Sequence, residues 1–286
     1  MNKLLQVIFL FSLFFNFAIA NEENQLTNEE QEYLSKNKTF TYTGDPNWLP
    51  YEAFDIQGNY IGIVAEHLKL IEKSRNLEFK KIVSKNWSDA LDIAVSGKAD
   101  IISGDAADAL LNQQFIPIET YLKNPIIVVM KNSENFVLDI NDIEDGKIAI
   151  IKDYGYTADI YKKYPNITFY ELENIQESLD CVSTGECKAM LASYALANYS
   201  INNYKYFDLK VVGSTEVTMN VTLFVNKEKP LLHSIINKSM KSISMSDHKN
   251  ILDKWNKVDE PWIDYKFLNE LIVIALLFMA IVLLLL

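Results

Sequence analysis

Residues 45–62 read Asp-Pro-Asn-Trp-Leu-Pro-Tyr-Glu-Ala-Phe-Asp-Ile-Gln-Gly-Asn-Tyr-Ile-Gly. Two prolines, Pro46 and Pro50, fix φ and stiffen a loop that carries several aromatic side chains. The Gln-Gly-Asn that follows predicts a turn, and Gly62 opens an apolar pattern with the helical period. A rigid aromatic loop at a strand end, followed by a hairpin and a helix, is where small ligands bind in an open α/β sheet.

Strand and helix patterns alternate on both sides of this stretch. Before it, Thr27 and Glu30 form a capping box, which predicts a short helix. After it, two sets of strands and helices indicate two parallel-rich α/β units, with segments 125–130 and 218–225 crossing between them. The other expected strands are 39–43, 79–83, 101–103, 147–151, 168–171 and 189–191, and the expected helices are 63–75, 87–96, 157–163, 175–183, 230–244 and 247–255.

The aromatic stretch resembles the opening of the family 3 solute-binding proteins, the periplasmic two-lobed Venus flytrap domains. Their pattern is Asp-Pro-x-Trp-x-Pro-aromatic-Glu followed by Asp-x-x-Gly-x-x-x-Gly-Ile, and residues 45–63 meet it. Further matches follow in the order and spacing of the family. They are Trp87 with Ala90 and Leu91, Gly97 and Asp100, Thr120-Tyr121, residues 152–156, Tyr164-Pro165, residues 182–185 and Lys254-Trp255.

The resemblance implies an α/β fold with two lobes, of the periplasmic-binding-protein type II. Lobe one is expected to comprise residues 38–124 and 217–258, and lobe two residues 125–216. Residues 21–37 are expected to form a linker helix, which is common in flytraps attached to membrane receptors. Residues 259–267 are the expected juxtamembrane segment.

The two apolar ends of the chain predict export and membrane attachment. Residues 1–20 resemble a signal peptide with an Ala-Ile-Ala cleavage site, and an uncleaved anchor is the alternative. Residues 268–286 predict a transmembrane helix, preceded by Trp262 and Tyr265 as interfacial anchors. The last sixteen residues are uncharged, and no cationic flank follows them. The chain is therefore expected to be a fragment cut inside this helix, with its ligand domain in the periplasm and its helix in the inner membrane; a complete protein with a membrane tail is the alternative.

Composition excludes several classes of function. The net charge of −11 argues against binding to nucleic acid. The three histidines are scattered without the spacing of metal ligands, so no metal is expected. The sequence contains no Gly-rich phosphate loop and no arguable catalytic grouping, and hence predicts no cofactor and no catalytic residue. Cys181 and Cys187 are a candidate disulfide in an oxidising compartment, and two unpaired thiols are the alternative.

The resemblance also identifies what the cleft lacks. In amino-acid-binding members of the family, an arginine on lobe one holds the ligand carboxylate and an aspartate on lobe two holds its ammonium group. These positions correspond to Leu111 and Ser193. The sequence has one arginine, Arg75, on the far side of the first helix pattern, so no guanidinium fork is expected in the cleft. A lysine, Lys123 or Lys152, is the alternative source of positive charge.

The expected binding site is acidic and aromatic. Carboxylates beside aromatic faces suit cationic or aromatic ligands rather than a standard α-amino acid bound through arginine. The alternative is that about half of the tyrosines belong to the core or the rim. The expected ligand-binding residues are Asp45, Trp48, Tyr51, Glu52, Asp105, Asp108, Tyr121, Tyr154, Tyr156 and Ser193.

These features predict a domain that closes on a small molecule as the sensor input of a truncated transmembrane receptor. The resemblance implies a histidine kinase or diguanylate cyclase as output, with a second receptor copy as partner. A membrane-tethered substrate-binding protein of a transporter, with a permease as partner, is the alternative. A dehydratase-like flytrap enzyme is the alternative of another class, for which Glu52, Glu171 or Glu173 would serve as the acid without an identifiable base.

Overall fold

The computed structural model describes residues 24–143, 146–256 and residue 273. The predicted signal peptide and juxtamembrane segment, and the predicted transmembrane helix apart from residue 273, lie outside these residues. No helix in the described part of the chain is both long and apolar enough to cross a membrane.

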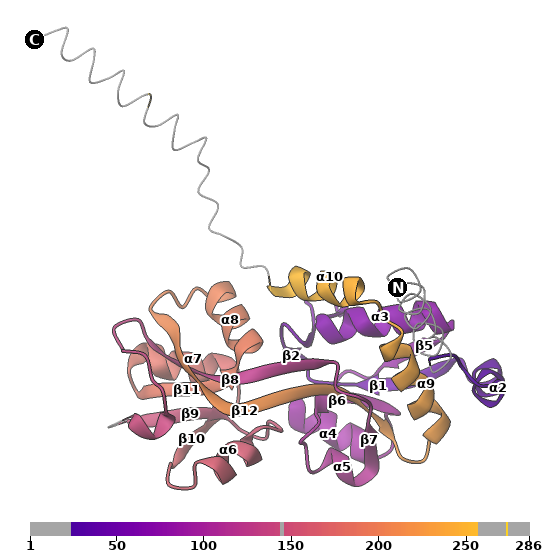
Figure 1. The fold of residues 1–286 in the computed structure, drawn as a ribbon, viewed down its shortest axis with the longest axis horizontal. Coiled ribbons are helices and arrows are strands. Elements are labelled where there is room, and N and C mark those ends of the chain that lie inside the picture. The colour runs from indigo at the N-terminus through magenta and orange to yellow at the C-terminus, as the bar shows by residue number, and fades with distance from the viewer. Residues whose placement is uncertain (1–23, 144–145, 257–272, 274–286) are drawn as a thin grey trace, which may run out of the picture. The chain divides into compact units, whose positions relative to one another are not determined.

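Helices pack on a long central sheet (Figure 1). The strands are β1 Thr39–Thr43, β2 Asn47–Trp48, β3 Glu52–Phe54, β4 Tyr60–Ile61, β5 Glu78–Lys81, β6 Ile101–Asp105, β7 Phe115–Pro117, β8 Leu122–Lys131, β9 Lys147–Ile151, β10 Phe169–Leu172, β11 Cys187–Ser193 and β12 Leu209–Asn226. The helices are α2 Asn28–Lys36, α3 Ile63–Arg75, α4 Trp87–Val95, α5 Leu111–Gln114, α6 Thr157–Lys163, α7 Ile175–Thr184, α8 Tyr194–Asn203, α9 Pro230–Lys241 and α10 Met245–Asn256, with a 3-10 turn η1 at Ile140–Asp142.

Two long antiparallel strands join the lobes. The sheet runs in the order β10-β9-β11-β8-β12-β6-β1-β5, with β7 also pairing with β12. Strands β1, β5 and β6 are parallel in lobe one, and β9, β10 and β11 are parallel in lobe two. Strands β8 and β12 pair with each other through both lobes, as Figure 1 shows. The predicted two-lobed α/β architecture with two crossings is confirmed.

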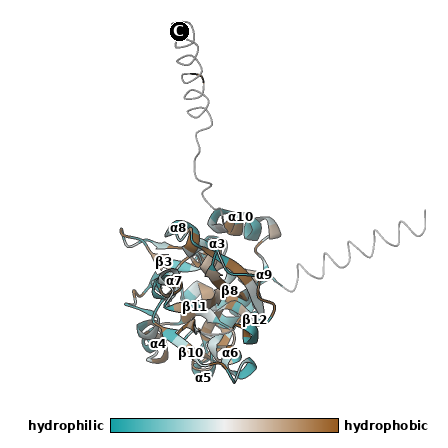
Figure 2. Ribbon diagram, turned by 90° about the vertical axis from the view of Figure 1, so that its left-hand side faces the viewer, coloured by the Kyte–Doolittle hydropathy of each residue, from teal (hydrophilic) through white to brown (hydrophobic). Residues whose placement is uncertain are grey.

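Helix α3 illustrates how the sequence fixes an element. Its N-cap is Gly62 at φ 116°, where a Cβ atom would lie 2.4 Å from the carbonyl oxygen of Tyr51. Only glycine tolerates both this φ and this approach. The apolar stripe of Val64, Leu68 and Ile71 is fully buried, as the helical period predicts. Figure 2 shows the same contrast across the domain, with apolar strands inside and hydrophilic helix faces outside.

Several elements differ from the sequence-based expectation, which also lacked the short α5 and β7. Helix α8 was not predicted, because it follows β11 with no turn residues between them. Strand β12 begins at Leu209 rather than at residue 218. Its register against β8 shifts between Val211 and Gly213 and again between Ser214 and Thr218, which interrupts the alternation that marks a strand.

A disulfide joins the end of α7 to the start of β11. Helix α7 is capped at its C-terminal end by Gly185, which has φ 87°. Cys181 and Cys187, on either side of this turn, are bonded with their Cα atoms 5.0 Å apart. The structure therefore has the bridged form of the two alternatives that the sequence allowed.

Candidate ligand-binding site

Glu52 anchors the aromatic loop inside lobe one. Its carboxylate is fully buried and accepts hydrogen bonds from the hydroxyls of Tyr42, Tyr60 and Ser103, and from the backbone N–H of Asp45 at 2.8 Å. Burial raises the pKa of Glu52. These hydrogen bonds hold β1, β6 and the aromatic loop together, and all of them lie within lobe one.

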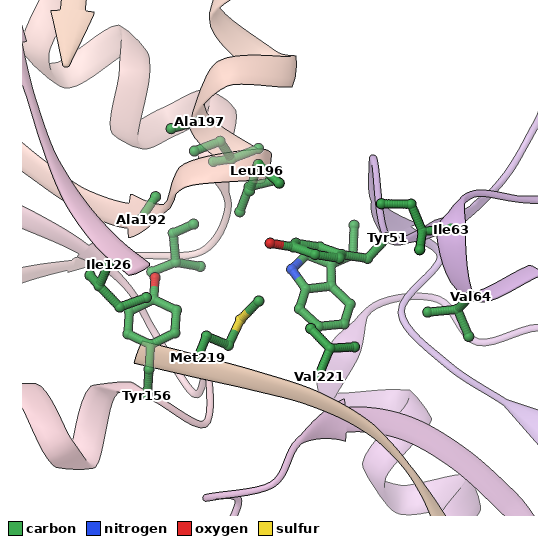
Figure 3. Packing of buried hydrophobic residues seen from close by; sticks show 14 of the residues in the cluster. Tyr51, Ile63, Val64, Ile126, Tyr156, Ala192, Leu196, Ala197, Met219 and Val221 are labelled. Atoms are coloured by element: carbon green, nitrogen blue, oxygen red, sulfur yellow. The ribbon is translucent and has the colours of Figure 1, made fainter. Parts of the chain in front are cut away.

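The aromatic loop meets lobe two directly. The hydroxyls of Tyr51 and Ser193 are 2.9 Å apart, although 142 residues separate them in sequence. Figure 3 shows Tyr51 reaching from lobe one toward Ala192 and Leu196 of lobe two. Trp87, at the start of α4, donates from its indole Nε1 to the carbonyl oxygen of Asp153 at 3.2 Å. The two lobes are therefore closed on each other.

Four of the predicted aromatic residues gather between the lobes. The ring centroid of Trp48 lies 4.4 Å from that of Tyr51 and 6.0 Å from that of Tyr154, which it meets edge-on. Tyr154 in turn lies 5.9 Å from Tyr156. Trp48, Tyr51 and Tyr156 are at most 5% exposed. The part of the cleft around Trp48 is thus filled by the protein's own side chains.

The cavity beside Trp48 and Asp105 has a volume of about 20 Å³, and two wider pockets, of about 330 and 380 Å³, also have walls from both lobes at Asp153 and Tyr154. The first cavity holds about one water molecule. Within the described residues, two polar atoms of its lining are buried without a hydrogen-bond partner, Trp48 Nε1 and Asp105 Oδ2. One is a donor and the other an acceptor, and neither has accessible surface while the lobes are closed. Its lining residues are Asp45, Trp48, Trp87, Gly104, Asp105, Tyr154, Gly155 and Met219.

The two carboxyl groups of this cavity are perturbed by burial. Burial raises the pKa of Asp45 to about 7, and the charge of Glu52 acts in the same direction. Burial also raises the pKa of Asp105 to about 6, against the hydrogen bonds that it accepts from the backbone of Ala107 and Asn220. A cation in the cavity would favour the ionised form of both groups.

Gly155 brings the lobes into contact at Asp105. A Cβ atom at residue 155 would lie 2.5 Å from the Cβ of Asp105, a distance that side chains do not adopt. Glycine is therefore required for this closed arrangement.

The positions of the amino-acid clamp are occupied differently. Leu111 is fully buried in the core of lobe one, and the hydroxyl of Ser193 is hydrogen-bonded to the hydroxyl of Tyr51. Arg75 donates to Ser239 Oγ at 2.8 Å and to the carbonyl oxygen of Asn24 at 3.4 Å, at the end of α3. Lys152 pairs with Glu173 at 2.9 Å. The single guanidinium of the sequence is therefore bound elsewhere in lobe one.

Asp108 accepts from the backbone N–H of Leu111, the first residue of α5, at 2.9 Å, and lines an interlobe pocket with Tyr154 and Gly155. The ring of Tyr121 lies 5.0 Å from that of His67, in a separate cavity. Sequence reasoning had not placed Trp87 or Met219 in the cleft. The signals available were an aromatic residue directly after the N-cap Asn86, and the alternation of the second crossing strand. Across the described residues, no group of three or more His, Cys, Asp or Glu side chains could hold a metal ion.

Comparison with protein families gives a match over residues 40–258 to the bacterial extracellular solute-binding proteins, family 3. Two curated relatives are sensor proteins. Sensor protein EvgS of Escherichia coli (strain K12) is 23% identical over 253 residues, which are 87% of this chain and 21% of the relative. Virulence sensor protein BvgS of Bordetella pertussis is 20% identical over 244 residues, which are 85% of this chain and 20% of the relative. The chain thus spans about a fifth of the length of these relatives.

A solved structure has the same fold. The crystal structure of the periplasmic VFT2 domain of Bordetella pertussis BvgS superposes with a TM-score of 0.74 at 19% identity, covering 81% of this chain and 99% of that one.

Proposed function

Since the chain belongs to the bacterial extracellular solute-binding proteins, family 3, we propose that it is the sensor input of a transmembrane receptor and recognises a small molecule outside the cytoplasm. The sensor proteins EvgS and BvgS, which match most of this chain, support the proposal. In this reading residues 1–20 direct export, residues 38–124 and 217–258 form lobe one, residues 125–216 form lobe two, and residues 268–286 anchor the domain in the inner membrane.

The ligand is a cation that preferably carries an aromatic group. The observation that carries this proposal is that two carboxylate residues, Asp45 and Asp105, line the same cavity between the lobes as Trp48. A positive charge there gains a charge-assisted hydrogen bond and a cation–π contact. An α-carboxylate would find one donor there, Trp48 Nε1, but would lie beside the carboxyl groups of Asp45 and Asp105, which disfavour a further negative charge.

Entry of a ligand into the cavity beside Trp48 and Asp105 requires movement of the lobes. A molecule larger than water exceeds the volume of about 20 Å³ of this cavity. The Tyr51–Ser193 contact must therefore open before a ligand enters. Such a ligand shifts the population between the self-closed and the ligand-bound arrangement by its difference in affinity for the two.

Two ligands of equal ring size and opposite charge test the proposed ligand class. The full chain in detergent should bind benzylammonium but not benzoate in calorimetric titration. Trp48→Ala and Asp105→Asn should each weaken the binding by about tenfold, which corresponds to about 1.4 kcal/mol. The control is Asp92→Asn, an exposed carboxylate on α4. Submicromolar binding of glutamate or glutamine would contradict the proposal.

The receptor role is tested separately in cells. A chimaera that joins this chain to the output of a histidine kinase should change the activity of its reporter when a cleft ligand is added. Asp105→Asn should shift that response to higher ligand concentrations. A reporter that ignores every ligand that binds would contradict the receptor role and leave the binding result intact.

A further inference from the structure

A pair of histidines joins helix α10 to lobe one. His67 of α3 and His248 of α10 are 181 residues apart in sequence, and Nε2 of the first lies 2.8 Å from Nδ1 of the second. Their ring centroids are 4.9 Å apart. His67 is 1% exposed, whereas His248 is half-buried. Figure 1 shows α10 lying over α3, and α10 also packs on α8 of lobe two.

The positions of the protons in this pair follow from the hydrogen bonds. Nδ1 of His67 lies 2.7 Å from the carbonyl oxygen of Ile63. Because a carbonyl oxygen only accepts, this nitrogen carries the proton of the neutral ring, and Nε2 of His67 accepts from Nδ1–H of His248. The two facing nitrogens share one hydrogen when the pair is neutral or holds one added proton. When both rings are charged, both nitrogens carry a hydrogen and the contact cannot form.

The carboxylates nearest the pair already have partners. Glu66 of α3 forms an ion pair of 2.7 Å with Lys254 of α10 and lies 3.8 Å from Lys69. Asp247 of α10 accepts from Ser244 Oγ at 2.7 Å. These groups therefore do not give the pair a carboxylate of its own.

The other elements around the pair bring no net charge to it. Glu119, in the segment before β8, forms an ion pair of 2.7 Å with Lys241 of α9. The ring of Tyr121 lies 5.0 Å from that of His67, and burial raises the pKa of Tyr121, so this hydroxyl is neutral. Helix α8 contains no charged residue.

Both histidines resist protonation while α10 is docked on α3. Burial lowers the pKa of His67 to about 4, and the charge of His248 acts in the same direction. Burial also lowers the pKa of His248. The charges of Glu66 and Asp247 oppose these shifts and do not outweigh burial. A histidine in water titrates near 6.5, so release of α10 takes up a proton, and the docked state loses stability as the pH falls from about 6.5 toward 4.

We infer that the His67–His248 pair is an acid-sensitive latch, which fastens α10 to lobe one at neutral pH and releases it when both rings are charged. Because α10 packs on α3 of lobe one and on α8 of lobe two, the latch makes the support of both lobes depend on the pH of the medium. This response needs no ligand in the cleft.

Hydrogen exchange of the full chain in detergent, without ligand, tests the latch. Protection factors correct for the intrinsic pH dependence of exchange. Between pH 7.5 and pH 5 they should fall about thirtyfold for the amides of α10, the change expected for one histidine with a docked pKa of about 4 and a released value of 6.5. The amides of α7 in lobe two should keep their protection.

Two variants separate the latch from the rest of the domain. His67→Gln should remove most of the fall, because glutamine provides an amide donor and acceptor but does not titrate. His233→Gln is the matched control: this histidine of α9 lies 3.0 Å from the carbonyl oxygen of Pro117, away from α10, and its replacement should leave the fall unchanged.

Three results would overturn the inference. They are equal protection of α10 at the two pH values, an undiminished fall in His67→Gln, and an equal fall in α7, which would indicate general unfolding in acid. If His67→Gln does not fold, NMR titration of the histidine rings in the parent decides, since a His67 ring that titrates at 6.5 excludes the latch. No ligand enters these measurements, so their outcome leaves the proposed cleft ligand untouched.

Discussion

Asp45 makes the stability of the domain depend on pH. Its side chain is 6% exposed, and burial raises its pKa to about 7 from an unfolded value of about 4. Between these two values the folded state holds a proton that the unfolded chain has released. The contribution of Asp45 is therefore fully present below about pH 4 and is lost as the pH rises through 7. The shift of about 3 units sets an upper bound on the order of 4 kcal/mol.

Asp45→Asn should remove this loss of folding stability at high pH. Asparagine keeps the oxygen that accepts from the N–H of Asn47 at 2.9 Å, and it does not ionise. The melting temperature of the variant should exceed that of the parent at pH 8 and match it more closely at pH 5. The control is Asp55→Asn: hydrogen bonds from Asn59 lower the pKa of that exposed carboxyl, so its titration lies below this window. Equal differences at both pH values would contradict the account.

The hydroxyl pair of Tyr51 and Ser193 should couple the lobes energetically. Each side chain is fully buried, and the two hydroxyls lie 2.9 Å apart. A double-mutant cycle of Tyr51→Phe and Ser193→Ala should give a coupling free energy of about 1 kcal/mol in denaturant unfolding. Additive effects within about 0.3 kcal/mol would show that the lobes do not hold this contact in solution.

At the scale of elements, the disulfide ties α7 to β11, and β11 carries Ser193 to the cleft. Replacing both Cys181 and Cys187 by serine should lower the free energy of unfolding by about 2 kcal/mol, because the bridge closes a short loop in the unfolded chain. The melting temperature should fall by about 5 °C for a domain of this size. A reductant should lower the melting temperature of the parent equally and leave the variant unchanged. An unaffected parent would mean that the bridge is absent or without effect.

At the scale of the whole domain, lobe one depends on both ends of its chain. Strand β6 pairs with β12, for example Asp105 with Val221, and α9 packs on α3 and β12. Residues 38–124 alone should therefore lack a cooperative transition in thermal circular dichroism, because β6 would expose an unpaired edge and its apolar face. The control joins residues 217–258 to this segment through a flexible linker and should restore the transition. Independent folding of the shorter segment would contradict the role assigned to β12.

The sequence by itself determined much of the scaffold, because its signals are local. The capping box at Thr27, the glycine at residue 62 and the buried stripe of α3 depend on neighbours within a few residues, and the structure has each where the pattern predicted it. The two crossings were also readable, since a β-branched apolar run marks the first and alternation marks part of the second.

Only the tertiary structure decided the roles within the cleft. The local sequence around Tyr51, Glu52 and Tyr121 does not distinguish their roles. In the structure Tyr51 bridges the lobes, Glu52 is hydrogen-bonded inside lobe one, and Tyr121 lines a second cavity. Their partners lie far away in sequence or on another element, as Ser193 does for Tyr51. A side chain's role depends on which distant groups share its burial and its hydrogen bonds, and the fold alone brings these groups together.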